Sequence, residues 1–256
     1  MTYNKNHKIV LQAIIHEGAM EEDHGKQLIE KLFGHDNSAE VLHRINTKLQ
    51  PLNMIIKYIN CEITGLLYWV FANTAQDTSI RPQLEYSEVH LTLLRTIFSE
   101  IVTSDEGHVS STWCLNLCPS SNINLSKNSA QMFLNDMVEK KWLFCKDGQY
   151  YIGVRSIAEL SQYFKDSHED KLRTCTLCKQ TLFYNFTQGQ KCEQCDAVIH
   201  LYCLSTYTKD QSNLRCPNCD HNIFNLDCSD DANNSPSDTE VSISKTKRPT
   251  RKRRKH

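Results

Sequence analysis

The fold of the C-terminal part is decided by residues 175–219, which read CTLCKQTLFYNFTQGQKCEQCDAVIHLYCLSTYTKDQSNLRCPNC. This stretch holds seven of the twelve cysteines and a single histidine. They form four pairs with two residues inside each pair: Cys175 and Cys178, Cys192 and Cys195, His200 and Cys203, and Cys216 and Cys219. A two-residue gap lets both side chains reach one ion from a tight turn, so four pairs predict two four-coordinate zinc sites.

The spacing alone does not decide which pairs share an ion. Sequential pairing, as in a zinc ribbon, and alternating pairing both satisfy it, because the five residues from Cys195 to His200 reach up to ~17 Å. In either case all eight ligand positions are filled and none is left for a catalytic water. We therefore expect structural zinc, which replaces the small hydrophobic core of a segment of about 55 residues.

The composition favours metal binding over disulfides. The opening MTYNKNHKIVLQAIIHEG lacks the pattern of a secretory signal, and no run of apolar residues is long enough for a membrane span. A reducing compartment is therefore expected, where clustered cysteines usually bind metal. Residues 245–256 carry eight Lys and Arg, which leaves 21 basic against 30 acidic residues elsewhere. The body of the chain is thus acidic and is not expected to hold DNA by charge alone.

The N-terminal part has the pattern of a winged helix. Two helical periods lie in residues 7–33, and a third lies in residues 37–50 and ends at Pro51. The β-branched and aromatic segments MIIKYIN and LLYWVFAN follow, with a turn around Gly65 between them. The third helix places four apolar residues on one face: Val41, Leu42, Ile45 and Leu49.

The same outline repeats in residues 84–166. A helix is predicted over 84–103 and another over 126–141, where Ser126 is the expected N-cap, whereas residues 109–118 favour neither helix nor strand. A hairpin follows with its turn at KDGQ, residues 146–149, and a short helix closes the repeat. The predicted class is α+β, with tandem winged-helix domains before a small RING-like domain that binds two zinc ions. The predicted boundaries are 1–80, 81–168, 169–226, and 227–256 for a disordered tail with a basic cluster.

The order of the zinc-binding residues resembles a variant RING finger, with His-x2-Cys as the third pair and Cys-Pro-x-Cys as the last. Together with the tandem winged helices and the stretch LLYWVFANT, it makes the chain similar to the non-SMC element one family. That family is the variant-RING subunit of the five–six SMC complex, and the resemblance covers about residues 7–225.

The resemblance implies an alternating arrangement of the ligands. Cys175, Cys178, His200 and Cys203 would hold the first zinc, and Cys192, Cys195, Cys216 and Cys219 the second. It also implies a RING-type ubiquitin ligase that acts in DNA repair and recombination, in the nucleus and on chromosomes. The implied partners are a MAGE-type subunit, a kleisin subunit and a ubiquitin-conjugating enzyme. Such a ligase is a scaffold without a catalytic residue, and Leu177 and Pro217 match the apolar positions that dock the conjugating enzyme.

Other interpretations of the zinc motif stay open. PHD fingers share this ligand order but usually carry Trp where this chain has Leu214, which favours the RING interpretation. Asp220 follows the last ligand, where many active RING fingers have Arg, so ligase activity is expected to be weak or dependent on a partner. Leu177 and Pro217 could also simply pack the small domain. The alternative function is a structural or PHD-like interaction module of the same complex without ligase activity.

The remaining signals concern DNA and localisation. The helix over 126–141 offers three lysines against Asp136 and Glu139, which favours a protein contact and only an indirect or weak DNA contact. The lysines are Lys127, Lys140 and Lys141. The basic cluster of the tail is typical of a nuclear import signal. Cys114 and Cys118 have no second pair nearby and are interpreted as structural.

Overall fold

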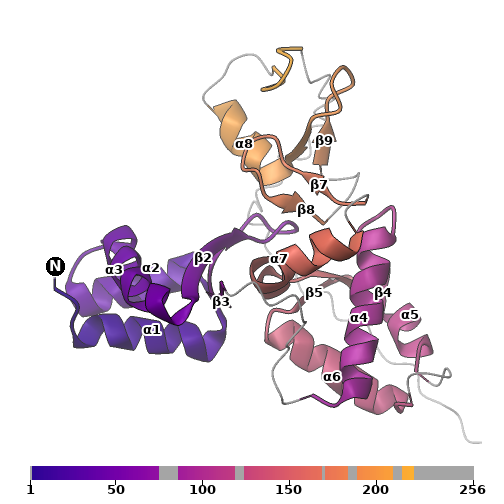
Figure 1. Ribbon diagram of the computed structural model, residues 1–256, viewed down its shortest axis with the longest axis horizontal. Coiled ribbons are helices and arrows are strands. Elements are labelled where there is room, and N and C mark those ends of the chain that lie inside the picture. The colour runs from indigo at the N-terminus through magenta and orange to yellow at the C-terminus, as the bar shows by residue number, and fades with distance from the viewer. Residues whose placement is uncertain are drawn as a thin grey trace, which may run out of the picture. The chain divides into compact units, whose positions relative to one another are not determined.

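The computed structural model describes residues 2–74, 86–118, 124–168, 171–183, 189–209 and 215–221. These residues belong to one compact unit, Met1–Ile223, which mixes helices and strands as the α+β prediction expected (Figure 1). The predicted tail over 227–256 lies outside the described residues. Among the residues that are described, no helix is long and apolar enough to cross a membrane.

The N-terminal part, residues 2–74, consists of three helices and a three-stranded antiparallel sheet. Its strands lie in the order β1-β3-β2, with Ala19 opposite Val70. The sheet contains the predicted hairpin and also a strand, β1, that the sequence pattern did not predict. The elements are α1 (Lys5–Glu17), β1 (Ala19–Glu21), α2 (Glu22–Phe33), α3 (Ser38–Leu49), the 3-10 turn η1 (Gln50–Leu52), β2 (Met54–Asn60) and β3 (Leu67–Asn73).

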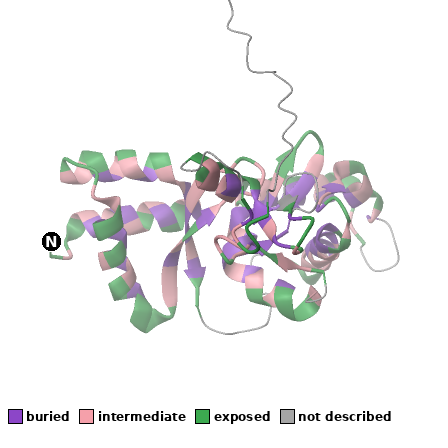
Figure 2. Ribbon diagram, turned by 90° about the horizontal axis from the view of Figure 1, so that it is seen from above, coloured by how far each residue is buried: buried purple, intermediate pink, exposed green. Residues whose placement is uncertain are grey.

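The core of this part lies between the helices and the sheet, as the burial pattern in Figure 2 indicates. The four apolar residues predicted on one face of α3 are all buried, which confirms that prediction. Trp69 of β3 is fully buried, and Gly25 of α2 lies directly against its ring. A Cβ atom at Gly25 would overlap the indole, so only glycine lets α2 approach the sheet this closely.

The middle part, residues 86–168, repeats this order of elements and adds a helix. The ambiguous residues 109–118 form a short strand and a helix whose N-cap, Ser110, accepts a hydrogen bond from the Trp113 amide at 3.1 Å. Ser126 caps α6 as predicted, accepting from the Ser129 amide at 3.1 Å. The strands lie in the order β4-β6-β5. The elements are α4 (Glu88–Thr103), β4 (Val109–Ser110), α5 (Ser111–Asn116), α6 (Lys127–Glu139), β5 (Leu143–Lys146), β6 (Gln149–Ile152) and α7 (Val154–His168).

The core of the middle part contains two of its three cysteines. Cys114 and Cys118 are buried among apolar side chains, and burial raises the pKa of the Cys114 thiol to about 12. Both fit the structural interpretation. The same hydrophobic cluster extends to Val70 and Ile59 of the first sheet and to Phe183 of the C-terminal part, so apolar packing connects all three parts.

The C-terminal part, residues 171–221, is built from short strands and one helix. Two small hairpins, β7–β8 and β9–β10, carry the first two pairs of metal-binding candidates in their turns, and an isolated bridge joins Cys175 to Val198. The elements are β7 (Arg173–Thr174), β8 (Thr181–Leu182), β9 (Gly189–Lys191), β10 (Val198–His200) and α8 (Leu201–Lys209). The domain boundaries proposed from the sequence stay predictions.

Candidate metal centre

The eight metal-binding candidates form two separate clusters. The first contains Cys175, Cys178, His200 and Cys203, and the second contains Cys192, Cys195, Cys216 and Cys219. Within each cluster the potential ligand atoms all lie within 4.8 Å of one another. Pairs one and three therefore come together, and so do pairs two and four. This is the alternating grouping, and it differs from the sequential grouping that the spacing had left open.

Tight turns place both cysteines of a pair on the same side of the chain. The amide of Lys179 donates to the carbonyl of Cys175 at 3.0 Å, and the amide of Asp220 donates to the carbonyl of Cys216 at 2.9 Å. The residue after the second cysteine has a positive φ in three pairs, at 60° for Lys179, 55° for Asp196 and 59° for Asp220. This left-handed conformation is unusual for residues other than glycine and closes the turn beneath the sulfur atoms.

In the first cluster, the His200 ring presents one nitrogen to the sulfur atoms. Its Nδ1 lies 3.3 Å from Cys178 Sγ and 3.8 Å from Cys203 Sγ. The histidine ends β10 directly before α8, and its side chain is only 4% exposed. Tyr202 stacks on the ring with 4.7 Å between the centroids. The imidazole is thus fixed with Nδ1 as the nitrogen available to a metal.

The second cluster consists of four sulfur atoms. Cys192 Sγ lies 3.6 Å from Cys219 Sγ, and Cys195 Sγ lies 3.6 Å from Cys216 Sγ. Four sulfurs around zinc at about 2.3 Å would be roughly 3.8 Å apart in a tetrahedron. These two separations are compatible with a tetrahedral metal site.

Two of the thiols have surroundings that favour the thiolate, whereas burial and the neighbouring thiols raise the pKa of Cys203, Cys216 and Cys219. Hydrogen bonding with the side chain of Asn218 and with the backbone of Ala197 lowers the pKa of Cys195 to about 6. In the first cluster, hydrogen bonding with the Cys203 thiol lowers the pKa of Cys175. The thiolate is the form of cysteine that binds metal. Three thiols with an imidazole, and four thiols, are donor sets that fit zinc in a structural site.

Glu62 is a member of this site that the sequence analysis missed. It lies in the turn between β2 and β3 of the N-terminal part, and its Oε1 is 3.2 Å from Nε2 of His200. The same carboxylate accepts a hydrogen bond from the Phe183 amide, at 3.2 Å to Oε1 and 3.1 Å to Oε2. An acidic residue in a hairpin turn is ordinarily solvated, so nothing in the local pattern marked it.

Comparison with known proteins identifies the family. A family model described as a RING-like domain matches residues 175–219, and the model of the Nse1 non-SMC component of the SMC5-6 complex matches residues 7–116. The non-structural maintenance of chromosomes element 1 homolog of Bos taurus is 31% identical over 83% of this chain and 82% of its own length. The chain belongs to the Nse1 family. The homolog of Xenopus laevis is 30% identical over 84% of this chain and 82% of its own length.

A solved structure supports the same assignment at the level of the fold. A chain of an Nse1-Nse3-Nse4 complex superimposes on this Nse1-family chain with a TM-score of 0.71 and 28% identity. The match covers 87% of this chain and 98% of that chain. The family predicted from the residue pattern is therefore confirmed, together with its RING-like C-terminal part.

The two docking candidates lie inside metal-binding turns of this Nse1-family chain. Leu177 sits between Cys175 and Cys178, and Pro217 follows Cys216; both are half-buried. Their role stays a prediction. Leu214, which favoured a RING over a PHD finger, lies outside the described residues. Asp220 is paired with Arg215, at 2.8 Å between Oδ2 and Nη1.

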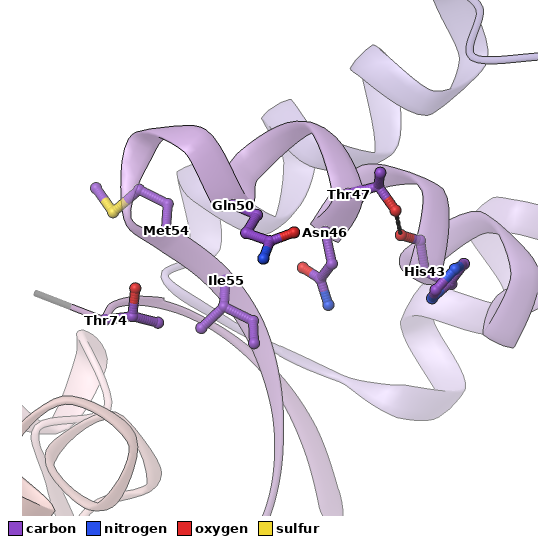
Figure 3. A pocket seen from close by; sticks show the side chains of 7 residues that line it. All are labelled: His43, Asn46, Thr47, Gln50, Met54, Ile55 and Thr74. Atoms are coloured by element: carbon purple, nitrogen blue, oxygen red, sulfur yellow. Dashed lines mark hydrogen bonds between the residues drawn. The ribbon is translucent and has the colours of Figure 1, made fainter.

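A pocket of about 260 Å³ lies elsewhere, beside α3 and β2 (Figure 3). His43, Thr47 and Gln50 line it together with four further residues: Asn46, Met54, Ile55 and Thr74. Two of its polar side chains have partners within the fold. Asn46 bonds both the amide and the carbonyl of Ile56, at 2.8 Å and 3.0 Å, and Thr47 donates to the His43 carbonyl at 2.9 Å. The side chains of Asn46 and Thr47 are therefore engaged within the fold and are not directed to a ligand by any contact that the described residues show.

Proposed function

We propose that this chain is the RING-type ubiquitin ligase subunit of an SMC5-6 complex, and that it acts in DNA repair and recombination on nuclear chromosomes. The observation that carries the proposal is the alternating grouping of eight Cys and His side chains in a chain of the Nse1 family. Alternating pairs are typical of RING fingers, whereas a zinc ribbon pairs its ligands in sequence. The first zinc is assigned to Cys175, Cys178, His200 and Cys203, and the second to Cys192, Cys195, Cys216 and Cys219.

The chemistry of such a ligase comes from position rather than from a reactive side chain. The two zinc ions supply cross-links that hold the metal-binding turns in place. The chain would bind a ubiquitin-charged conjugating enzyme and keep its thioester accessible to a substrate lysine. The lysine attacks the thioester carbonyl directly, and the thiol of the conjugating enzyme leaves. Orienting the two reactants lowers the barrier, and no covalent intermediate forms on the ligase.

Leu177 and Pro217 are the proposed docking residues. Each lies in a turn between two metal ligands, so the metal fixes its backbone, and each is half-buried, which leaves apolar surface for a partner. The docking role of Leu177 and Pro217 depends on this partial exposure, because fully buried side chains could not contact a conjugating enzyme. Asp220 occupies the position after the last ligand and is engaged by Arg215, which fits an activity that depends on a partner subunit.

The proposed partners are a MAGE-type subunit and a kleisin subunit. The solved relative comes from an Nse1-Nse3-Nse4 complex, and its match extends over most of this chain. Direct DNA binding through α6 and the two lysines that follow it is less favoured. Lys140 pairs with Asp136 at 3.2 Å, and Lys127 donates to Asn116 at 3.0 Å, so two of the three lysines have partners within the protein. We therefore propose that any DNA contact is weak or made through other subunits.

The proposal is tested with variants that should weaken binding of the conjugating enzyme without disturbing the fold or the zinc sites. The variants Leu177→Asp and Pro217→Asp are expected to slow ubiquitin discharge from a charged conjugating enzyme about tenfold or more while both zinc ions stay bound. The matched control is Leu52→Asp, because Leu52 is an exposed leucine of η1, outside the metal-binding turns. Unchanged discharge in both docking variants would reject these residues as the docking surface.

A second candidate function is a zinc-stabilised structural module without ligase activity. It is favoured by the contacts that anchor the RING-like part in the rest of the chain, namely Phe183 in the shared core and Glu62 on His200. It predicts that Cys216→Ser disrupts assembly with the partner subunits, whereas Leu177→Asp has no effect on any function of the complex.

A further inference from the structure

We propose that Glu62 positions His200 for metal binding, so that the β2–β3 turn of the N-terminal part belongs to the first metal site. This inference rests on the proposed zinc binding and adds to it a residue outside the RING-like part. Glu62 lies 138 positions before His200 and is not a metal ligand. It acts through the histidine and is therefore a positioning residue.

The geometry fixes the tautomer of the histidine. The Nδ1 atom faces the sulfur atoms of Cys178 and Cys203, at 3.3 Å and 3.8 Å, and is the nitrogen placed to bind the ion. The proton of the neutral ring must then be on Nε2, where Glu62 accepts it at 3.2 Å. A carboxylate that accepts this bond orients the ring and increases the basicity of the nitrogen that binds metal.

The carboxylate itself is held rigidly. The Phe183 amide donates to both of its oxygen atoms, and the Phe183 ring packs edge-on against Phe164 of α7, with 5.1 Å between the centroids. Phe164 in turn packs against Phe98 of α4 at 5.4 Å. Glu62 is therefore fixed by a contact that is anchored in the core of the middle part.

The β2–β3 turn also lies near Tyr202, the residue beside the His200 ring. A Cβ atom at Gly65 would lie 3.5 Å from the Cβ of Tyr202, so the turn lies against the start of α8. Tyr202 is the residue that stacks on the imidazole. The turn thus constrains His200 twice, through the carboxylate on Nε2 and through the tyrosine on the ring face.

Burial makes the Glu62 contact matter for metal binding. The side chains of Glu62 and His200 are 8% and 4% exposed, so water cannot easily replace either partner. Removing the carboxylate leaves the Nε2 proton and the Phe183 amide without this acceptor in a buried place. In the second cluster, the hydrogen bonds to sulfur that the described residues show come from within the RING-like part, namely from Asn218, the Ala197 backbone and the cysteines themselves. The two metal sites should therefore respond differently to a change at Glu62.

The test measures zinc release from the full chain under excess chelator, with wild type, Glu62→Ala, Glu62→Gln and the control Glu30→Ala. Glu30 is an exposed residue of α2 in the same part of the chain. In Glu62→Ala we expect one of the two zinc ions to leave about 10–100-fold faster, as for other residues that support a metal ligand, and the other to leave at the wild-type rate. Glu62→Gln keeps the shape and one acceptor atom, and we expect it to release zinc at an intermediate rate. It is the test variant if Glu62→Ala does not fold.

A second readout reports on the histidine directly. In the zinc-loaded wild type, imidazole NMR should show His200 with a proton on Nε2 that is protected from exchange with water. This protection should be lost in Glu62→Ala and kept in Glu30→Ala. Wild-type release of both ions in Glu62→Ala and Glu62→Gln, or equal acceleration of both ions, would overturn the inference while leaving the zinc assignment intact. A wild-type chain that holds fewer than two zinc ions would overturn the zinc assignment itself, and this inference with it.

Discussion

Glu62 and His200 lie 138 positions apart in the sequence, and their side chains meet at 3.2 Å. The contact joins a hairpin turn of the N-terminal part to a candidate metal ligand of the RING-like part. Because Phe183 binds the same carboxylate and enters the core of the middle part, the RING-like part is integrated into the chain rather than tethered to it. Four predictions follow from this arrangement and from the packing around it.

Truncating Phe183 should weaken both the fold and the first metal site. Phe183 is 3% exposed and packs against Phe164. Replacing a buried phenylalanine with alanine typically costs about 3–5 kcal/mol of unfolding free energy. We expect Phe183→Ala to lose this much in chemical denaturation and to release one zinc ion faster under chelator. Phe183→Leu, which keeps most of the apolar volume, should lose clearly less. Equal stability of the wild type and both variants would contradict the proposed anchor.

Adding a methyl group at Gly25 should destabilise the N-terminal part. The new Cβ atom would overlap the ring of Trp69, which is fully buried and cannot move without disturbing the sheet. Overpacking of this kind costs roughly 1–3 kcal/mol. Gly25→Ala should therefore lower the unfolding free energy by this amount in urea titration, although alanine favours helices. Gln27→Ala, at an exposed position of the same helix, should change it little. A stabilised Gly25→Ala variant would show that α2 does not pack as described.

A glycine at position 179 should stabilise the first metal-binding turn. Lys179 is exposed and has a φ of 60°, which is unfavourable for a residue with a Cβ atom. Lys179→Gly relieves this strain and should raise the unfolding free energy by about 0.5–1 kcal/mol, measured by thermal unfolding of the zinc-loaded chain. Lys179→Ala keeps the strain and should not stabilise. A loss of stability in the glycine variant would argue against the left-handed turn.

The cysteines outside the metal clusters should differ in reactivity with pH. Burial raises the pKa of Cys114 to about 12, so its thiol stays protonated, and unreactive, until the pH approaches that value. Cys145 is exposed on β5. At pH 8 we expect iodoacetamide to modify Cys145 in the zinc-loaded protein and to leave Cys114 unmodified, as read by peptide mass spectrometry. Modification of Cys114 at the rate of Cys145 would contradict the burial of Cys114.

The sequence predicted most of the elements that carry their own local signal. The apolar face of α3, the serine cap of α6 and the turn at Asp147 and Gly148 are each encoded by a few neighbouring residues, and all are present. The strand β1 was missed because three residues are too few to show a period of two, and its pairing partner β3 is about 50 residues away. Residues 109–118 were ambiguous because two elements share ten positions.

The sequence identified which residues are candidate metal ligands, but the spacing did not show which of them share an ion. The two-residue spacing within each pair identifies the eight Cys and His residues, since both ligands of a turn must reach one ion. Which pairs meet depends on the tertiary arrangement of the metal-binding turns, and this was available only from the family resemblance. Glu62 could not be predicted, because its role is created by tertiary contact with His200 and Phe183 rather than by its neighbours in the sequence.

The central claim is that this Nse1-family chain is a RING-type ubiquitin ligase. The most direct test is discharge of ubiquitin from a charged conjugating enzyme, with the purified zinc-loaded chain alone and with a MAGE-type partner, and with Cys216→Ser as the metal-site control. We predict discharge that increases when the partner is added and is lost in the Cys216→Ser variant. No discharge across a panel of conjugating enzymes, with both zinc ions bound and the partner assembled, would contradict the ligase function and favour the structural module.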